Sequence, residues 1–318
     1  MKRWVHFETL SREDPRMSKQ AFDKKLEAVE ALRLEPDPAV KVDKLSKALR
    51  DRSNYLVSKA AELAADLNLS ALIPDLLAAF DHFLTDPAKS DPQCWAKNAI
   101  AKALKNLRHL NAQVYLKGIV HVQLEPVSGG RADSAATLRG TCALATAAAL
   151  SQLARPEGAL LLRLKLLLGD KEPEVMGQCF TSLLSLTPLD SVPFIGRFLK
   201  AADEDVRLEA ACTLAQSREP AAIEVLKGFW QDRLSPELRT AFLASLGASP
   251  LPEAAEFLLT IIASESAELA ASALAALAAS RFRTEMRDRT AAAIEAKQDA
   301  NLKYIFEHKF PRTGISPS

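Results

Sequence analysis

The sequence has few glycines and few aromatic residues. Its 318 residues include 11 glycines, and aromatic residues make up 6% of the chain. No strand-like alternation of useful length is present, so a sheet-rich fold is excluded. Alanine and leucine, the strongest helix formers, are abundant instead, as in the run Leu269–Ala279. The composition predicts an all-α protein.

An excess of charge of one sign is also lacking. Lys and Arg together number 41 against 40 Asp and Glu, so the net charge is +1. Proteins that bind nucleic acid non-specifically normally carry a clear basic excess. The balance therefore disfavours that class for the chain as a whole, while a local basic stripe stays open.

Cysteine is sparse, and none of the four cysteines lies in a CxxC pair. A zinc site or a thioredoxin-like motif is therefore not indicated. Cys142 and Cys179 each follow an apolar residue of the repeat described below by four positions, and we expect them to be buried as small hydrophobic residues. This usage suits a reducing compartment. The remaining two are Cys94 and Cys212.

Long hydrophobic runs are missing. The nearest one, Gly158–Gly169, is short and is interrupted by Arg163 and Lys165, so we expect no membrane span and no membrane partner. The first 15 residues have no continuous apolar segment of the signal-peptide kind. The expected location is the cytoplasm. We expect residues 1–17 to be a disordered extension, with Met17 an alternative start, and residues 311–318 to be a disordered tail.

Motifs for catalysis are absent as well. The five histidines lack ligand spacing, and no HExxH, GxSxG, P-loop or GxGxxG pattern occurs. We therefore predict no catalytic residue, no cofactor and no metal site. The sequence favours a non-enzymatic protein without deciding the point.

An internal repeat dominates the second half of the chain. Apolar residues at i, i+4 and i+8, which mark one face of a helix, follow an acidic or capping residue four times. The four copies begin at Val175, Val206, Leu238 and Leu269, at intervals of 31, 32 and 31 residues. Three nearly equal intervals predict one structural unit used repeatedly.

Weaker copies precede these four. They begin at Leu56, Trp95 and Leu138, and their longer spacing indicates longer loops in the N-terminal half. A second apolar helix is expected between successive copies, for example over residues 73–83, 112–122, 158–168 and 192–199. The pattern predicts about eight stacked antiparallel helix pairs over residues 18–310, closed by a charged capping helix at residues 281–297.

The segment Val192–Leu214 resembles a HEAT-like repeat. The family pattern is a helix, an acidic turn, and a second helix with Val-Arg and paired Ala and Leu. The resemblance extends over residues 38–280 and includes the short HEAT-like repeats of phycobilin lyases. It implies a right-handed α-solenoid and says little about activity. The residues that match the pattern are Asp205, Val206, Arg207, Ala210, Ala211 and Leu214.

Two families with the same repeat are catalytic. Deoxyhypusine hydroxylases bind iron through His-Glu pairs, and this chain contains no His-Glu dipeptide. HEAT-like alkylpurine DNA glycosylases use a basic groove with aromatic and carboxylate residues, of which only Trp95 and nearby lysines have a counterpart here. Neither activity is predicted.

Trp95, Asn98 and Lys102 form the richest polar and aromatic cluster, because their spacing of i, i+3 and i+7 places them on one helix face. Asn54, Lys59 and Arg139 occupy comparable early positions in neighbouring helices. The resemblance implies that these second helices line a concave surface, so the six residues are the predicted binding surface.

Two functions follow for that surface. The first is a protein-interaction scaffold that holds a protein partner along the concave face. The alternative is a nucleic-acid-binding or DNA-repair protein with a partly basic groove, which requires Lys59, Lys97, Lys102 and Arg139 to converge. Gly129-Gly130, in a long loop at residues 125–134, could open backbone amides to phosphate or form a flexible turn. The partner itself, the pathway and the oligomeric state are not encoded in any pattern found.

Overall fold

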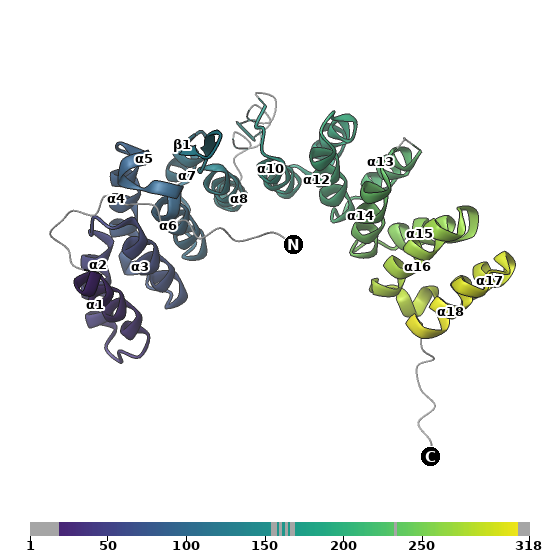
Figure 1. The fold of residues 1–318 in the computed structure, drawn as a ribbon, viewed down its shortest axis with the longest axis horizontal. Helices are drawn as coiled ribbons and strands as arrows, with labels where there is room; N and C mark the ends of the chain where they lie inside the picture. Colours follow the sequence, from purple (N-terminus) through teal and green to yellow (C-terminus); the bar gives the residue numbers. More distant parts are fainter. Residues whose placement is uncertain are drawn as a thin grey trace, which may run out of the picture. The chain divides into compact units, whose positions relative to one another are not determined.

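The structure is a computed structural model that describes residues 19–153, 169–231 and 234–310, with positions 158, 161, 162 and 165 between them. The predicted extension 1–17, the predicted tail 311–318 and most of the predicted helix 158–168 lie outside these residues. The chain divides into two compact units, residues 1–142 and 143–318 (Figure 1). Most described residues lie in helices, and strands are confined to one short hairpin among them, which confirms the all-α prediction.

The N-terminal unit consists of two layers of helices. In the first layer α3 packs against both α1 and α6, and in the second layer α2 packs against α4 (Figure 1). The first-layer helices are α1 (Lys19–Glu30), α3 (Asn54–Asp66) and α6 (Trp95–Asn106); the second-layer helices are α2 (Pro38–Leu49) and α4 (Ile73–Phe83), followed in the chain by α5 (Pro87–Ser90) and α7 (Ala112–Ile119). The last helix, α8 (Ala136–Leu153), crosses the boundary between the units.

The C-terminal unit repeats the two-layer arrangement more regularly. Each even-numbered helix from α10 to α18 packs against the next even one, and each odd-numbered helix from α11 to α17 against the next odd one. The even helices are α10 (Pro173–Leu186), α12 (Glu204–Ala215), α14 (Pro236–Gly247), α16 (Ala267–Ala279) and α18 (Ala300–Lys309); the odd ones are α11 (Pro188–Gly196), α13 (Pro220–Trp230), α15 (Pro252–Ser264) and α17 (Arg283–Lys297). The predicted repeat of stacked helix pairs is confirmed.

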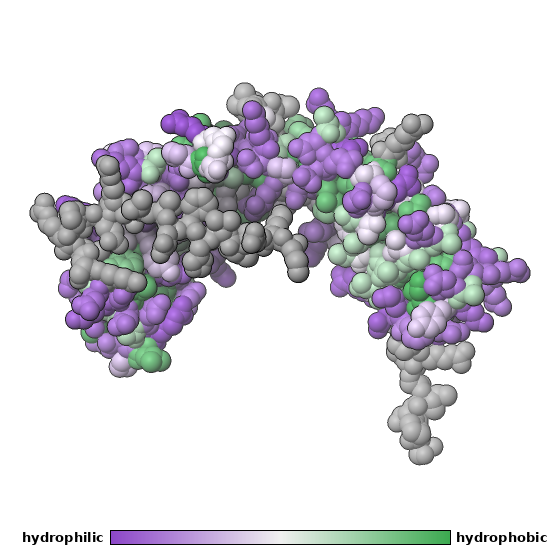
Figure 2. Space-filling model, viewed as in Figure 1, coloured by the Kyte–Doolittle hydropathy of each residue, from purple (hydrophilic) through white to green (hydrophobic). Residues whose placement is uncertain are grey.

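The repeat positions form the core of each pair. In α12, Val206, Ala210 and Leu214 are buried, as the i, i+4, i+8 pattern predicts. Cys142 and Cys179 are buried as expected, while Cys212 is half-buried. The visible face of the C-terminal unit shows pale green and white residues over α14 to α16, where small side chains are frequent (Figure 2).

Several helices begin with a side chain that caps the first turn. The Asp37 side chain accepts a hydrogen bond from the Ala39 backbone N–H, and Ser235 accepts one from Leu238, each directly before a proline at the first helical position. In α11 the first helical position is taken by Pro188, and a second proline, Pro193, lies inside the helix.

Gly247, at the end of α14, lies against the backbone of α16. A Cβ atom added there would come within 2.5 Å of the Ala276 carbonyl oxygen, a distance that backbone cannot accommodate without moving. We therefore expect Gly247→Val to destabilise the C-terminal unit by about 1–3 kcal/mol, the usual cost of overpacking. Urea unfolding of this variant tests it. Gly228→Val is the control, because nothing lies within 4 Å of a Cβ there; equal stability of the two variants would contradict the close approach.

Candidate functional site

A row of aromatic rings crosses the first layer of the N-terminal unit. Phe22 of α1, Tyr55 of α3 and Trp95 of α6 each lie near the N-terminal end of their helix. The ring centroids of Phe22 and Tyr55 are 6.3 Å apart, and those of Tyr55 and Trp95 are 5.6 Å apart in an edge-to-face arrangement. Trp95 is 44% exposed, so the row is open to solvent at α6. Large aromatic rings that stay exposed are typical of interaction sites.

A lysine of α3 flanks this row. The Lys59 ammonium lies 5.7 Å from the centroid of the Tyr55 ring, within the range of a cation–π contact. Its Nζ atom also forms a 2.8 Å ion pair with Glu62, one turn further along the helix. The hydrogen bond to Glu62 is the largest cause that raises the pKa of Lys59. The charge of Lys59 is therefore largely balanced within α3.

Two polar side chains of α6 continue the surface from Trp95. Asn98 is half-buried, and its Oδ1 accepts a 3.3 Å hydrogen bond from the Thr141 hydroxyl of α8. Lys102 is exposed, and no described residue forms an ion pair with it. We call the surface made by these six residues the aromatic–lysine face. Its members are Phe22, Tyr55, Lys59, Trp95, Asn98 and Lys102.

Two polar side chains expected on the binding surface, one cation and one amide, make contacts within the protein instead. Arg139 is 3% exposed, because its guanidinium forms an ion pair with Asp133 and donates to the His121 carbonyl at 3.1 Å. Asn54 donates its amide to Asp91 and to the Pro92 carbonyl, at 2.9 Å each. The structure therefore brings together Lys59, Trp95, Asn98 and Lys102 of the predicted set and places Asn54 and Arg139 elsewhere.

Lys97, the further cation of the predicted basic groove, is fully buried. Its Nζ atom lies 2.9 Å from Asp91 Oδ2, and both side chains have no exposed surface. The ammonium also donates to the Phe83 carbonyl at 3.2 Å. With Lys97 and Arg139 both buried, the four cations of the nucleic-acid hypothesis do not converge on one open face.

Asp91 organises the approach to α6. Its carboxylate accepts hydrogen bonds from the backbone N–H groups of Ala96 and Lys97, at 2.9 and 3.0 Å, and so caps the helix. A 3-10 turn over Pro92–Cys94 lies between Asp91 and the start of the helix at Trp95.

Backbone strain is concentrated directly before Trp95. Gln93 and Cys94 have φ angles of 61° and 57°, in the left-handed region that residues other than glycine rarely adopt. Such residues persist only when their surroundings hold them. Here the Gln93 N–H donates to Glu125 Oε1 at 2.8 Å, and the Cys94 N–H donates to the Asp91 carbonyl at 3.0 Å. The start of α6, and with it Trp95, is therefore fixed by neighbouring segments.

The segment that holds Gln93 is a β-hairpin where the sequence predicted a loop. Its strands are β1 (Leu124–Val127) and β2 (Gly130–Asp133), paired antiparallel. Gly129, with a φ of 93°, makes the turn between them. The Glu125 carboxylate accepts from Ser134 as well as Gln93, and the Gln123 amide donates to the Asp91 carbonyl at 2.8 Å. The glycine pair therefore serves a turn of a hairpin that supports α6.

The ion pair of Asp133 and Arg139 makes the hairpin sensitive to acid. Burial alone would raise the pKa of Asp133, but hydrogen bonds from the backbone of Gln123 and Ala135 and from Arg139 outweigh it and hold the pKa below its ordinary value. A lowered pKa stabilises the fold above the unfolded-state pKa, and that stability is lost as the pH falls through the folded-state pKa.

We therefore expect Asp133→Asn to lower the melting temperature at pH 7 and to differ less from the wild type below about pH 4, where the unfolded aspartate is protonated. Thermal unfolding of both proteins between pH 3 and pH 7, in steps of about half a unit across that range, gives the comparison. A difference in melting temperature that is constant over this range would show that Asp133 carries no pH-dependent stability.

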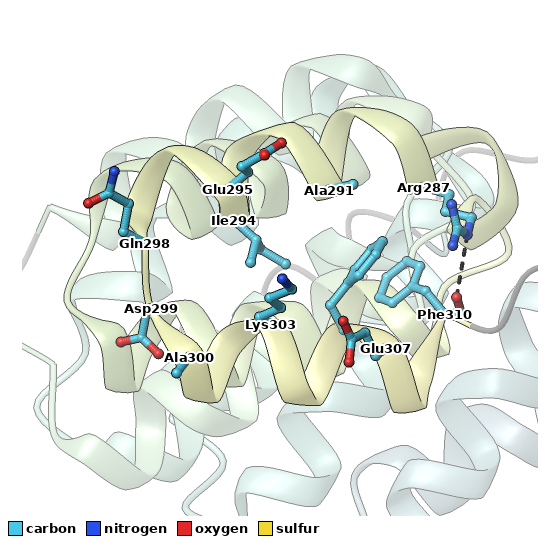
Figure 3. Close-up of a pocket in the computed structure, with 11 residues that line it drawn as sticks. Arg287, Ala291, Ile294, Glu295, Gln298, Asp299, Ala300, Lys303, Glu307 and Phe310 are labelled. Carbon is cyan, nitrogen blue, oxygen red and sulfur yellow. Dashed lines mark hydrogen bonds between the residues drawn. The ribbon is translucent and has the colours of Figure 1, made fainter.

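A cleft of about 740 Å³ lies between α17 and α18 of the C-terminal unit (Figure 3). Ile294 and Phe306 are apolar lining residues, and Lys303 of α18 points across the cleft toward α17 (Figure 3). Arg287 donates a 3.3 Å hydrogen bond to the Phe310 carbonyl at one end. The lining of the cleft carries charges of both signs, so no ligand class is indicated.

The described residues do not meet the requirements for a metal site, a nucleophilic thiol or a membrane-spanning helix. Within them, no group of three or more His, Cys, Asp or Glu side chains is arranged to hold a metal ion. Burial raises the pKa of the Cys94 thiol to about 12, so this side chain is not poised as a nucleophile. None of the helices described has both the length and the apolar character needed to cross a bilayer.

The comparisons with known proteins concern the repeat. A family model of HEAT repeats matches residues 159–247 and 192–278. Human deoxyhypusine hydroxylase in complex with glycerol is similar at 18% identity over 84% of this chain and 92% of that chain, with a TM-score of 0.31. The complex of CpcE and CpcF of phycocyanin lyase from Nostoc sp. PCC7120 is similar at 20% identity over 80% of this chain and 92% of that chain, with a TM-score of 0.41.

Scores this low carry no argument about the function of the chain. No curated protein matches it. The family match falls on the C-terminal unit, where the helix pairs repeat most regularly and where Val206, Ala210 and Leu214 occupy the core positions of the pattern. The family model therefore identifies HEAT repeats over residues 159–247 and 192–278 of the chain.

Proposed function

We propose that this protein is an interaction scaffold that binds a protein partner through the aromatic–lysine face of its N-terminal unit. The single observation that supports this most strongly is the row of Phe22, Tyr55 and Trp95 across three successive first-layer helices, with Trp95 44% exposed. Aromatic residues of this kind dominate the binding energy of protein interfaces. A stack of helix pairs supplies a rigid, extended surface on which such residues can be displayed.

Preorganisation supports the same proposal. Trp95 follows two left-handed residues whose backbone is held by hydrogen bonds to Glu125 and Asp91. Because the start of α6 is already fixed, little conformational entropy is lost there on binding. Strained backbone next to an exposed aromatic side chain is a combination expected at a binding site rather than in an inert part of a fold.

A nucleic-acid partner is favoured less by the same residues. Lys97 and Arg139 are buried in ion pairs, and Lys59 is paired with Glu62. Binding along a phosphate backbone draws on several exposed cations, and the aromatic–lysine face offers Lys102 as the cation without an ion pair to any described residue.

Trp95→Ala tests the proposal. We expect this variant to lose at least about 2 kcal/mol of partner binding, the scale of an interface hot spot, with little change in folding stability because the ring is half exposed. Nuclease-treated pull-downs from the source lysate, quantified by mass spectrometry with wild type and variant, provide the measurement. Tyr304→Ala is a matched control, since Tyr304 is 60% exposed in the other unit. Retention of every partner by Trp95→Ala, or loss of all partners on nuclease treatment of the wild type, would contradict the proposal.

A further inference from the structure

The aromatic–lysine face has two ends of different chemistry. Tyr55 and Trp95 form an aromatic end, and Lys102 lies two turns along α6 from Trp95. At a rise of about 1.5 Å per residue, seven residues of helix separate the two ends by about 10 Å. Asn98 lies between them on the same side of the helix.

The charges at the lysine end do not cancel. Lys59 is neutralised by Glu62 at 2.8 Å, and Asp66, on the next turn of α3, is paired with Arg33 at 2.7 Å. Lys102 is exposed and has no ion pair with any residue that the structure describes. The lysine end therefore has one positive charge to offer to a ligand.

Asn98 adds a hydrogen-bond donor beside that charge. Its Oδ1 accepts from the Thr141 hydroxyl, so the amide nitrogen remains as its hydrogen-bond donor. Within the described part of the chain no acceptor is found for this nitrogen. A single carboxylate, which can accept from both an ammonium and an amide, is the complementary group.

We propose that the occupant of the aromatic–lysine face is a protein segment with an apolar or aromatic side chain on Tyr55 and Trp95 and an acidic side chain, about 10 Å away, on Lys102 and Asn98. This rests on the proposed function and adds the chemistry of the partner. In an extended segment the acidic residue lies about three positions from the apolar one.

Selection from a displayed library of random peptides tests this with defined probes. The baits are the full-length wild type, Lys102→Glu and Trp95→Ala, with Lys200→Glu as a control at an exposed lysine of the other unit. We expect the wild type and Lys200→Glu to enrich peptides that combine an apolar residue with Asp or Glu at a fixed spacing. Lys102→Glu is expected to enrich Lys or Arg at that position and to bind the wild-type peptides at least about tenfold more weakly.

The outcomes separate the two proposals. If Lys102→Glu selects the same acidic peptides as the wild type, or the wild type shows no acidic preference, the partner chemistry is wrong while the face still stands. If Trp95→Ala selects the same peptides as the wild type, or the wild type enriches none, the aromatic–lysine face is not a peptide-binding site and both proposals fail.

Discussion

Asp91→Ala is expected to destabilise the N-terminal unit by about 3–5 kcal/mol, the cost of leaving one member of a buried ion pair without its partner. Asp91 and Lys97 are both fully buried, and their charged atoms are 2.9 Å apart. The substitution strands the Lys97 ammonium in the core and removes the cap from the first turn of α6. It also removes one of the two acceptors of the Asn54 amide.

Urea unfolding of the full chain, combined with hydrogen exchange of peptides from α3 and α6, measures this loss. Asp81→Ala is the control, because the Asp81–Lys117 pair has 58% and 52% exposed side chains and should contribute less than about 1 kcal/mol. If Asp91→Ala and Asp81→Ala cost the same, the buried pair does not hold the start of α6. The double variant Asp91→Leu/Lys97→Met should lose less stability than Asp91→Ala, since no charge is then left buried without a partner.

The second large effect is expected from Leu214→Asp in the C-terminal unit. Leu214 has no exposed surface and lies in α12, which packs against both α10 and α14. Burying a carboxylate without a partner costs several kcal/mol, and neighbouring units of an array share that loss through their interfaces. We expect α10, α12 and α14 to lose protection from hydrogen exchange while α3 and α6 keep it.

Leu189→Asp provides the matched control for this substitution. Leu189 is 74% exposed in α11 of the same unit, so the same chemical change there should leave stability within about 0.5 kcal/mol of the wild type. Unchanged protection of α12 in Leu214→Asp would show that the repeat positions do not form the core.

The helices could be predicted from the sequence because their signals are local. Residues four apart, such as Val206 and Ala210, lie on one face of any α-helix, and both are buried. The caps formed by Asp37 and Ser235 also depend on residues only two or three positions away, so they too can be predicted from the sequence. The short helix over Ala112–Ile119 ends before the predicted Val122, because the chain leaves it to reach the hairpin.

The candidate site was predicted only in part because its polar partners are distant in sequence. Trp95, Asn98 and Lys102 share a face by helical spacing alone, and the structure keeps them there. Arg139 and Lys97 looked alike as cations on helices, and nothing local distinguishes them from Lys102.

What buries these two cations is the position of their carboxylates. Asp133 comes from the hairpin that precedes α8. Asp91 comes from a turn whose left-handed residues are not glycines, so no sequence pattern predicts them. The hairpin itself was missed because four-residue strands carry too little alternation to be recognised.

The most direct test of the account is photo-crosslinking from the aromatic–lysine face in cells of the source organism. A photoreactive amino acid would replace the exposed Asn106, one turn beyond Lys102 on α6, or, as a control, the 74% exposed Lys47 of α2 in the second layer. We predict a nuclease-resistant protein adduct at position 106 that is absent at position 47 and is lost when Trp95→Ala is added. Equal adducts at both positions, or an adduct at 106 that persists without Trp95, would contradict binding at this face.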